Sequence, residues 1–188
     1  MKIYKHLSLV LIVGLTSCGS GASEEDGTAG QADSNSTELP TALQRGMVEV
    51  DLNEFYVNAS ILVPDENRGE QNISRNDDFG ETRVQVGTIY DVIIAEQIEG
   101  DLNTYIQMLS EDITFTNEVI EQGDDYVLYK SSITDSYIDP EYHFFAIKTI
   151  DGIVYELHDY NEEGGYAESV ARLMLESVNH MKANNTAT

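Results

Sequence analysis

The sequence predicts an α+β domain, with a single antiparallel-rich sheet on which a mid-chain helix and a long C-terminal helix are packed. Two observations predict this class. Runs rich in β-branched and aromatic residues follow one another with turn residues between them, which is typical of strands that pair with their sequence neighbours. Two other stretches, around Leu102 and around Val170, have the apolar spacing of a helix. Sequential strands whose faces are covered by helices define an α+β domain.

The first strands are expected on both sides of Pro64. In residues 48–52 apolar side chains alternate with acidic ones, and this period of two is typical of a half-buried strand. Residues 55–63 form a second run that ends at the proline. We expect a loop over 65–80, because this segment is polar and contains only two large apolar residues.

A pair of strands is expected next, over residues 81–86 and 88–98, separated at Gly87. The run Tyr90–Ala95 is almost continuously apolar. Such a run predicts a central strand that is buried on both faces for most of its length.

Helical spacing then replaces the strand pattern. Apolar residues over 102–109 recur at the positions of one helix face, and we expect a cap at Asp101 or Gly100 and an end near Asp112. The same spacing returns over 167–182 and predicts the amphipathic C-terminal helix.

Between the two helices we expect a meander of four strands, over 115–121, 126–133, 142–150 and 153–160. The last two strands flank Asp151-Gly152. Asp-Gly between two alternating runs is a strong signal for a two-residue hairpin.

The order of these elements resembles the PsbP-like fold, which is shared by an extrinsic subunit of photosystem II and a Ran-binding import factor. The stretches that carry the resemblance are Ile61-Leu62-Val63-Pro64, Val92-Ile93-Ile94 before Asp101-Leu102, Tyr142-His143-Phe144-Phe145, Ile153-Val154-Tyr155 and the last helix. The resemblance implies a domain over about residues 47–181. It also implies a binding or accessory role, because members of that fold are mostly non-catalytic.

The chain of 188 residues is expected to have four parts: a signal peptide over 1–17, a lipidated cysteine with an acidic tether over 18–45, the domain over 46–183, and a tail over 184–188. The tether is rich in Gly, Ser, Ala, Asp and Glu. We expect it to be disordered, because it has too little apolar surface to offset the entropy of ordering.

The first residues have the parts of a secretory signal. Lys2 and Lys5 precede a mostly apolar run over 7–15, and small residues follow it. The apolar run is too short to cross a bilayer, which takes about 20 residues. We therefore expect export of the protein.

Leu15-Thr16-Ser17-Cys18 resembles the lipobox of bacterial lipoproteins. In that family the cysteine thiol is lipidated, the signal is cut before it, and the new amine is acylated, commonly with palmitate. Cys18 is the only cysteine, so it has no disulfide partner within the chain. Two or more acyl chains hold a protein stably on a membrane. The alternative is an ordinary secretory signal with an incidental cysteine.

The residues after the cysteine favour the outer membrane. Gly19 stands where an aspartate would look like an inner-membrane retention signal. Ser23-Glu24-Glu25-Asp26 is similar to the signal that sends some lipoproteins to the cell surface. The alternative is a solvated charge run in the tether. We expect an outer membrane lipoprotein on the periplasmic or the cell-surface face.

The composition is strongly acidic, with 10 Lys and Arg against 34 Asp and Glu and a formal charge of -24. Phosphate contacts need clustered basic side chains, so this balance excludes a nucleic-acid binder. It leaves cationic partners, metal ions and simple solubility open.

The predicted hairpin brings candidate metal ligands to one sheet face. Its register places Phe145 opposite His158 and His143 opposite Tyr160, so that the two imidazoles lie diagonally, with Cα atoms about 7–8 Å apart. Together with Glu156 they form a set that suits a divalent ion. The alternative is two half-buried histidines that are satisfied by Tyr160 or Glu156.

Other candidates are weaker. Asp77-Asp78 with Glu81, and Asp124-Asp125, lie near glycines where calcium ligands could converge, but neither has the spacing of a calcium loop. Tyr137 and Tyr166 lie in or beside loops, where tyrosine can serve as an interface anchor.

The sequence contains no GxSxG, HExxH, GxxxxGK[ST], SxxK or CxxC motif. The leading prediction is therefore a membrane-anchored, non-catalytic binding or accessory module for a protein partner, without a cofactor. The alternative is a metal-ion-binding lipoprotein, and the third possibility is a hydrolase that uses paired carboxylates.

Mass spectrometry of the mature protein should find a chain that begins at Cys18 and carries acyl groups on it, because the lipobox resemblance implies both cleavage and lipidation. An unmodified thiol at Cys18 would contradict the anchor.

Overall fold

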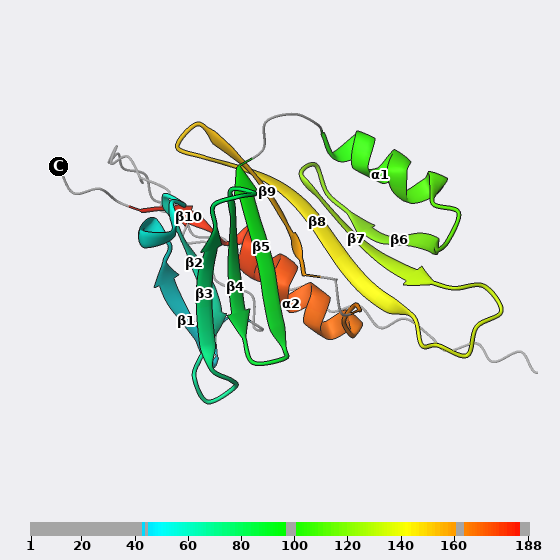
Figure 1. Cartoon of the computed structure of the whole chain (residues 1–188), viewed down its shortest axis with the longest axis horizontal. Helices are drawn as coiled ribbons and strands as arrows, with labels where there is room; N and C mark the ends of the chain where they lie inside the picture. The colour runs from blue at the N-terminus through cyan, green and yellow to red at the C-terminus, as the bar shows by residue number, and fades with distance from the viewer. Residues whose placement is uncertain (1–42, 44, 97–100, 161–163, 185–188) are drawn as a thin grey trace, which may run out of the picture. The chain divides into compact units, whose positions relative to one another are not determined.

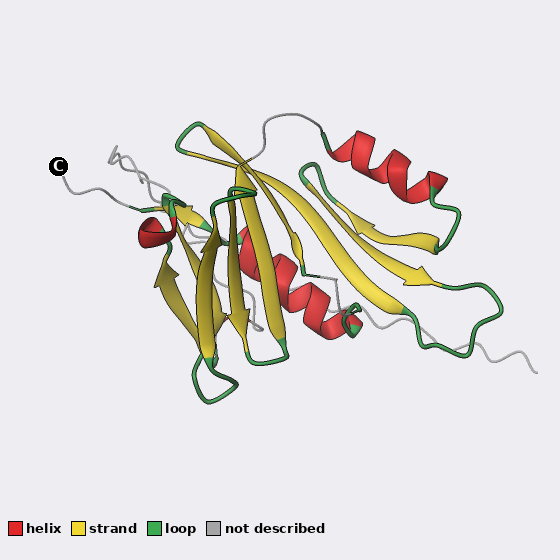
Figure 2. Ribbon diagram, viewed as in Figure 1, coloured by secondary structure: helices red, strands yellow, loops and turns green. Residues whose placement is uncertain are grey.

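The computed structural model describes residues 43, 45–96, 101–160 and 164–184 (Figure 1). It contains two antiparallel sheets and two α-helices (Figure 2), which confirms the α+β class. The predictions for the signal peptide, for Cys18 and for the charge run after it lie outside the described residues. Within the described part, no helix is long and apolar enough to span a membrane.

The expectation of a single sheet is wrong. One sheet has seven strands in the order β3-β4-β5-β9-β8-β7-β6, and the other has three in the order β1-β2-β10. The strands are β1 (Met47–Asp51), β2 (Ala59–Pro64), β3 (Gln71–Asn76), β4 (Glu81–Val86), β5 (Tyr90–Glu96), β6 (Thr116–Gln122), β7 (Tyr126–Ser132), β8 (Glu141–Ile150), β9 (Ile153–Asp159) and β10 (Lys182–Ala183). The helices are η2 (Asn53–Phe55, a 3-10 turn), α1 (Leu102–Glu111) and α2 (Glu168–Asn179).

The polar segment predicted as a loop contains β3, an edge strand of the larger sheet. Its only large apolar side chain, Ile73, packs against the core, while its other residues are polar. With only one large apolar residue, the segment shows almost no alternation of apolar and polar side chains, so its sequence does not indicate a strand. Hydrogen bonding to β4 holds it in the extended conformation.

The second predicted strand is also shorter than expected. Residues 53–55 form the 3-10 turn η2, and Tyr56 follows it in a left-handed conformation, with φ of 64°. The strand β2 therefore starts only at Ala59.

The hairpin between β8 and β9 is confirmed, together with part of its register. Ile150 pairs with Ile153 and Phe145 pairs with His158, as the two-residue turn requires. Asp151 and Gly152 both have positive φ angles, 51° and 82°, which is the geometry of a type I′ turn.

The helix α1 begins as predicted, because the Asp101 side chain accepts a hydrogen bond from the Thr104 backbone N–H at 2.8 Å. The second helix ends earlier than the predicted Lys182, at Asn179. The chain then forms β10, in which Ala183 pairs with Ala59 of β2.

The two helices use opposite faces of β8. Phe144 and Ala146 belong to the larger core, to which α2 and the smaller sheet contribute. Phe145 and Ile147 belong to a second cluster under α1, together with Leu102. Alternate residues of a strand point to opposite faces, so one strand serves both cores.

Buried polar bonds join the helix α2 to both sheets. The Ser177 hydroxyl is bonded to the Tyr90 hydroxyl at 2.8 Å and donates to the Leu62 carbonyl of β2. Burial raises the pKa of Tyr90. The buried Tyr90 side chain is therefore a neutral phenol.

Two methionines test the packing of the helices. Met174 of α2 is fully buried, whereas Met108 of α1 is 63% exposed. Met174→Ala should lower the free energy of unfolding by about 2–5 kcal/mol, because it leaves a cavity in the core. Chemical denaturation should show a change within about 0.5 kcal/mol for Met108→Ala. Equal effects of the two substitutions would contradict the assigned burial of α2.

Candidate functional site

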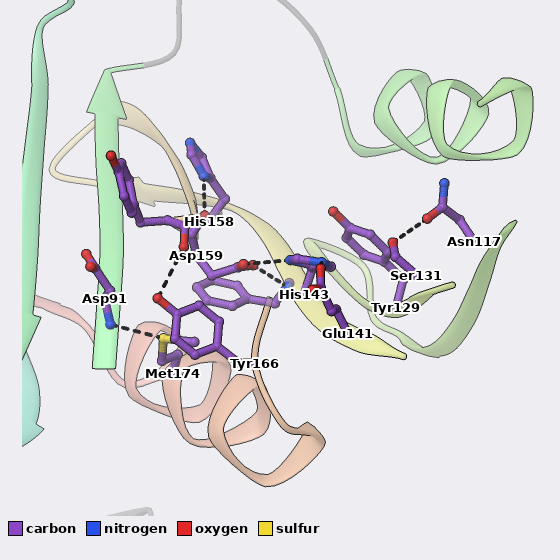
Figure 3. A network of polar contacts seen from close by, with 12 residues as sticks. Asp91, Asn117, Tyr129, Ser131, Glu141, His143, His158, Asp159, Tyr166 and Met174 are labelled. Atoms are coloured by element: carbon purple, nitrogen blue, oxygen red, sulfur yellow. Dashed lines mark hydrogen bonds and ion pairs between the residues drawn. The ribbon is translucent and has the colours of Figure 1, made fainter. Parts of the chain in front are cut away.

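The three predicted metal ligands are not brought together. His143 is 6% exposed and its Nδ1 lies 2.7 Å from an Asp159 carboxylate oxygen. The Nδ1 atom of His158 lies 2.9 Å from the Asp159 backbone oxygen, and the two imidazoles point in different directions (Figure 3). Among the described residues, no group of three or more His, Cys, Asp or Glu side chains could hold a metal ion.

The predicted acidic sites likewise form no group of three ligands within the described part of the chain. Asp77 lies in the turn between β3 and β4, where an oxygen of its carboxylate is 3.5 Å from the Arg75 Nε atom. Asp125 accepts a hydrogen bond from the Lys148 ammonium group at 2.7 Å. Each of these carboxylates has a cationic neighbour from its own part of the sheet.

The expected pairing of His143 with Tyr160 is absent from the described β8–β9 ladder, because β9 ends at Asp159. Beyond that point Tyr142 forms a bridge with Tyr166. The Asp159 carboxylate lies at the point where the strand next to β8 changes from β9 to the segment at Tyr166. It accepts a hydrogen bond from the Phe144 backbone N–H at 2.8 Å and contacts His143 (Figure 3). The carboxylate thus provides an acceptor for a buried N–H that has no partner on β9.

A polar hollow of about 250 Å³ lies beside His143, at the C-terminal end of α1. The strand register explains its floor, because Asn117, Ser131 and Glu141 are consecutive partners on β6, β7 and β8, and Tyr129 is the partner of His143. The lining residues are Leu109, Asp112, Phe115, Asn117, Tyr129, Ser131, Glu141 and His143. We call this feature the polar hollow.

Aromatic contacts hold one wall of the polar hollow. The rings of Tyr129 and His143 stack with centroids 5.3 Å apart. The Tyr129 hydroxyl is bonded to the Tyr105 hydroxyl of α1 at 2.9 Å, and the Tyr105 ring stacks on Phe145 at 3.8 Å. These contacts fix α1 over the sheet next to the hollow.

Charge in the polar hollow is negative. The Asp112 carboxylate accepts the backbone N–H groups of Phe115 and Thr114 at 3.0 and 2.7 Å, and these bonds lower its pKa. Glu141 contributes a second carboxylate, and one of its oxygens is 3.9 Å from the His143 Nε2 atom. The lining contains no Lys or Arg among the described residues.

An apolar hollow of about 320 Å³ adjoins the polar hollow and shares Phe115, Ser131 and Glu141 with it. Its other lining residues are Ser132, Ile133, Ile138, Asp139 and Gly164. We call this feature the apolar hollow.

The loops that line the apolar hollow carry exposed apolar side chains. Ile113 and Tyr137 are fully exposed, and Ile138 is 65% exposed. With Phe115 and Ile133 they come from two neighbouring loops, which a hydrogen bond between the Thr116 and Thr134 hydroxyls joins at 3.0 Å. We call these five apolar residues the apolar end.

The two tyrosines predicted as interface anchors differ. Tyr137 belongs to the apolar end and is free of cover. Tyr166 is half-buried, packs against the core and donates its hydroxyl hydrogen to the Tyr160 carbonyl. Tyr166 therefore belongs to the framework.

Arg83 and Asp91, which no sequence motif marks as a pair, form a second polar group on the sheet. The Arg83 guanidinium donates two hydrogen bonds to the Asp91 carboxylate, at 2.8 and 2.5 Å, and lies 3.6 Å from the centroid of the Tyr160 ring. The bonds to Asp91 raise the pKa of Arg83. Positions 83 and 91 lie on paired strands, and that pairing is the signal that could have found them.

No protein family, curated protein or solved structure matches the chain. The hollows and the apolar end are therefore the features from which a function can be inferred.

The Tyr105–Tyr129 pair predicts a loss of stability at high pH. Burial raises the pKa of Tyr105 to about 12 and also raises the pKa of Tyr129 above its ordinary value. A raised pKa in the folded state gives stability that is present below the unfolded pKa of about 10 and is lost as pH rises through the folded pKa.

Denaturation curves between pH 10 and 12 should therefore show a steep fall in the free energy of unfolding. The fall should be smaller by roughly 4 kcal/mol when both Tyr105→Phe and Tyr129→Phe are present, because each phenol contributes about 2 kcal/mol over this range. Tyr137→Phe serves as the control and should leave the pH profile unchanged. An unchanged profile in the double variant would contradict the burial of the pair.

Proposed function

We propose that the chain is an outer-membrane-anchored lipoprotein whose folded domain is a non-catalytic binding module for a protein partner. In this proposal Cys18 holds the protein on the membrane and the acidic segment after it is a tether. The domain recognises the partner and catalyses no reaction.

The observation that supports partner binding is the apolar end. Soluble monomers rarely expose large contiguous apolar patches, and such patches often mark interaction sites. Here Ile138 lines the apolar hollow, and the fully exposed Ile113 and Tyr137 belong to the loops that contribute to it. Tyrosine is enriched among the residues that carry the binding energy of protein interfaces.

We also infer a PsbP-like architecture for the domain. Support comes from the order of elements, with strands first, then α1, four antiparallel strands and a closing helix. The accessory role implied by that resemblance agrees with the proposed function.

The alternative functions have less support. For metal binding, the described residues offer no group of three ligands, and His143 is engaged by Asp159. For hydrolysis by paired carboxylates, the polar hollow would need a general acid with a raised pKa. The pKa of Asp112 is instead lowered by its bonds to backbone N–H groups.

Photo-crosslinking tests the proposal. A benzophenone amino acid at position 137, in protein expressed in its native membranes, should give a discrete crosslinked protein, because the side chain projects from the apolar end. Position 56 is the matched control, since Tyr56 is also an exposed tyrosine but lies next to η2.

The expected result is a protein adduct at position 137 and none at position 56. Absence of an adduct at position 137, or equal labelling from both positions, would contradict the proposed binding surface.

A further inference from the structure

The polar hollow and the apolar hollow form one continuous surface with two chemistries. Phe115, Ser131 and Glu141 line both of them, so a ligand in one hollow is in contact with the border of the other. A segment that binds here must therefore satisfy a polar, acidic site and an apolar site at neighbouring positions.

The polar hollow has the size of a side-chain site. Its volume of about 250 Å³ is below the ~300–1,000 Å³ of pockets that hold small-molecule ligands. The carboxylates of Asp112 and Glu141 and the rings of Phe115 and Tyr129 line the same hollow. Carboxylates beside aromatic rings are suited to an ammonium or a guanidinium group.

The buried histidine adds an acceptor to this site. The Nδ1 atom of His143 is bonded to the Asp159 carboxylate, which in its ionised form can only accept, so in the neutral ring the proton is on Nδ1 and Nε2 is an acceptor. Nε2 and the Glu141 Oε2 atom are then two acceptors 3.9 Å apart. A cationic N–H donor between them would satisfy both.

The backbone of Gly165 packs closely against the His143 ring. A Cβ atom at Gly165 would lie 2.7 Å from Nε2 and 2.5 Å from the Glu141 Cβ atom, which is closer than real contacts allow. Glycine at this position therefore lets the backbone pack against the His143 ring and Glu141, which holds the two acceptors in place.

The negative charge of the surrounding loops also favours a cationic ligand. Residues 109–116 and 131–141, which contribute the two loops, contain five acidic residues and no Lys or Arg. Like charges oppose an acidic partner, whereas a basic one is attracted.

We propose, building on the proposed function, that the partner is a protein segment that places a Lys or Arg side chain in the polar hollow and a neighbouring large apolar side chain in the apolar hollow. The cation donates to Glu141 and to the His143 Nε2 atom, with Asp112 nearby. The apolar side chain packs among Phe115, Ile133 and Ile138.

Selection from a phage-displayed library of random seven-residue peptides tests this assignment. The full chain, solubilised in detergent at about physiological salt, should enrich peptides in which Lys or Arg lies within three positions of a large apolar residue. In the variant with both Asp112→Asn and Glu141→Gln, the enrichment of basic residues should fall at least tenfold. In Glu141→Gln alone it should fall by a smaller factor. Ile138→Ser should instead lose the enrichment of apolar residues.

The acidic surface could attract basic peptides without a site, so a charge-matched control is needed. Glu54→Gln with Glu66→Gln removes two exposed carboxylates that belong to neither hollow and should leave the enrichment unchanged. Equal loss in this control, no preference for Lys or Arg, or an unchanged preference in Glu141→Gln would overturn the proposal. Circular dichroism melting shows whether each variant is folded.

The two proposals fail separately. A protein adduct at position 137 without any preference for basic residues would refute the cationic site and leave the binding module standing. Absence of an adduct at position 137 would refute the binding module itself.

Discussion

The fold depends on the burial of β8 on both faces. Phe144 and Ala146 pack toward α2 and the smaller sheet, and Phe145 and Ile147 pack toward α1. Because alternate residues of one strand supply both cores, loss of this strand would remove the contact surface of both helices at once. The apolar run of β8, an interior strand of the seven-stranded sheet, is the constraint on which the packing of both helices depends.

The two hollows lie near the N-terminal end of β8, where the burial of this strand ends. Toward its N-terminal end, β8 loses β9 as a partner, and the Asp159 carboxylate and the segment at Tyr166 take its place. Over the same end of the sheet α1 stops at Glu111, so polar side chains of β6, β7 and β8 are left uncovered. The two hollows thus form where β9 and α1 end, and the cores on both sides of the sheet keep their lining residues in place.

The sequence predicted most of the fold, because the signals for it are local. The Asp-Gly turn, the Asp101 cap and the apolar run of β5 each act over a few residues, and each is confirmed. The strand β3 was missed because Ile73 alone gives no period. The polar hollow was also missed, since its residues come from separate segments that only the register of three strands and the end of α1 bring together. The contacts of Asp159 with Phe144 and His143 could not be predicted from the sequence, because they depend on where β8 changes its neighbouring strand.

Hydrogen–deuterium exchange on the full chain is the measurement that bears most closely on partner binding through the apolar end. Exchange is compared before and after addition of detergent-solubilised membrane proteins from the same cells. We expect slower exchange, confined to the amides of residues 112–116 and 133–141. Protection confined to β3 and β4 at the other edge of the sheet, or none at all, would contradict the claim that the domain binds a protein through the apolar end.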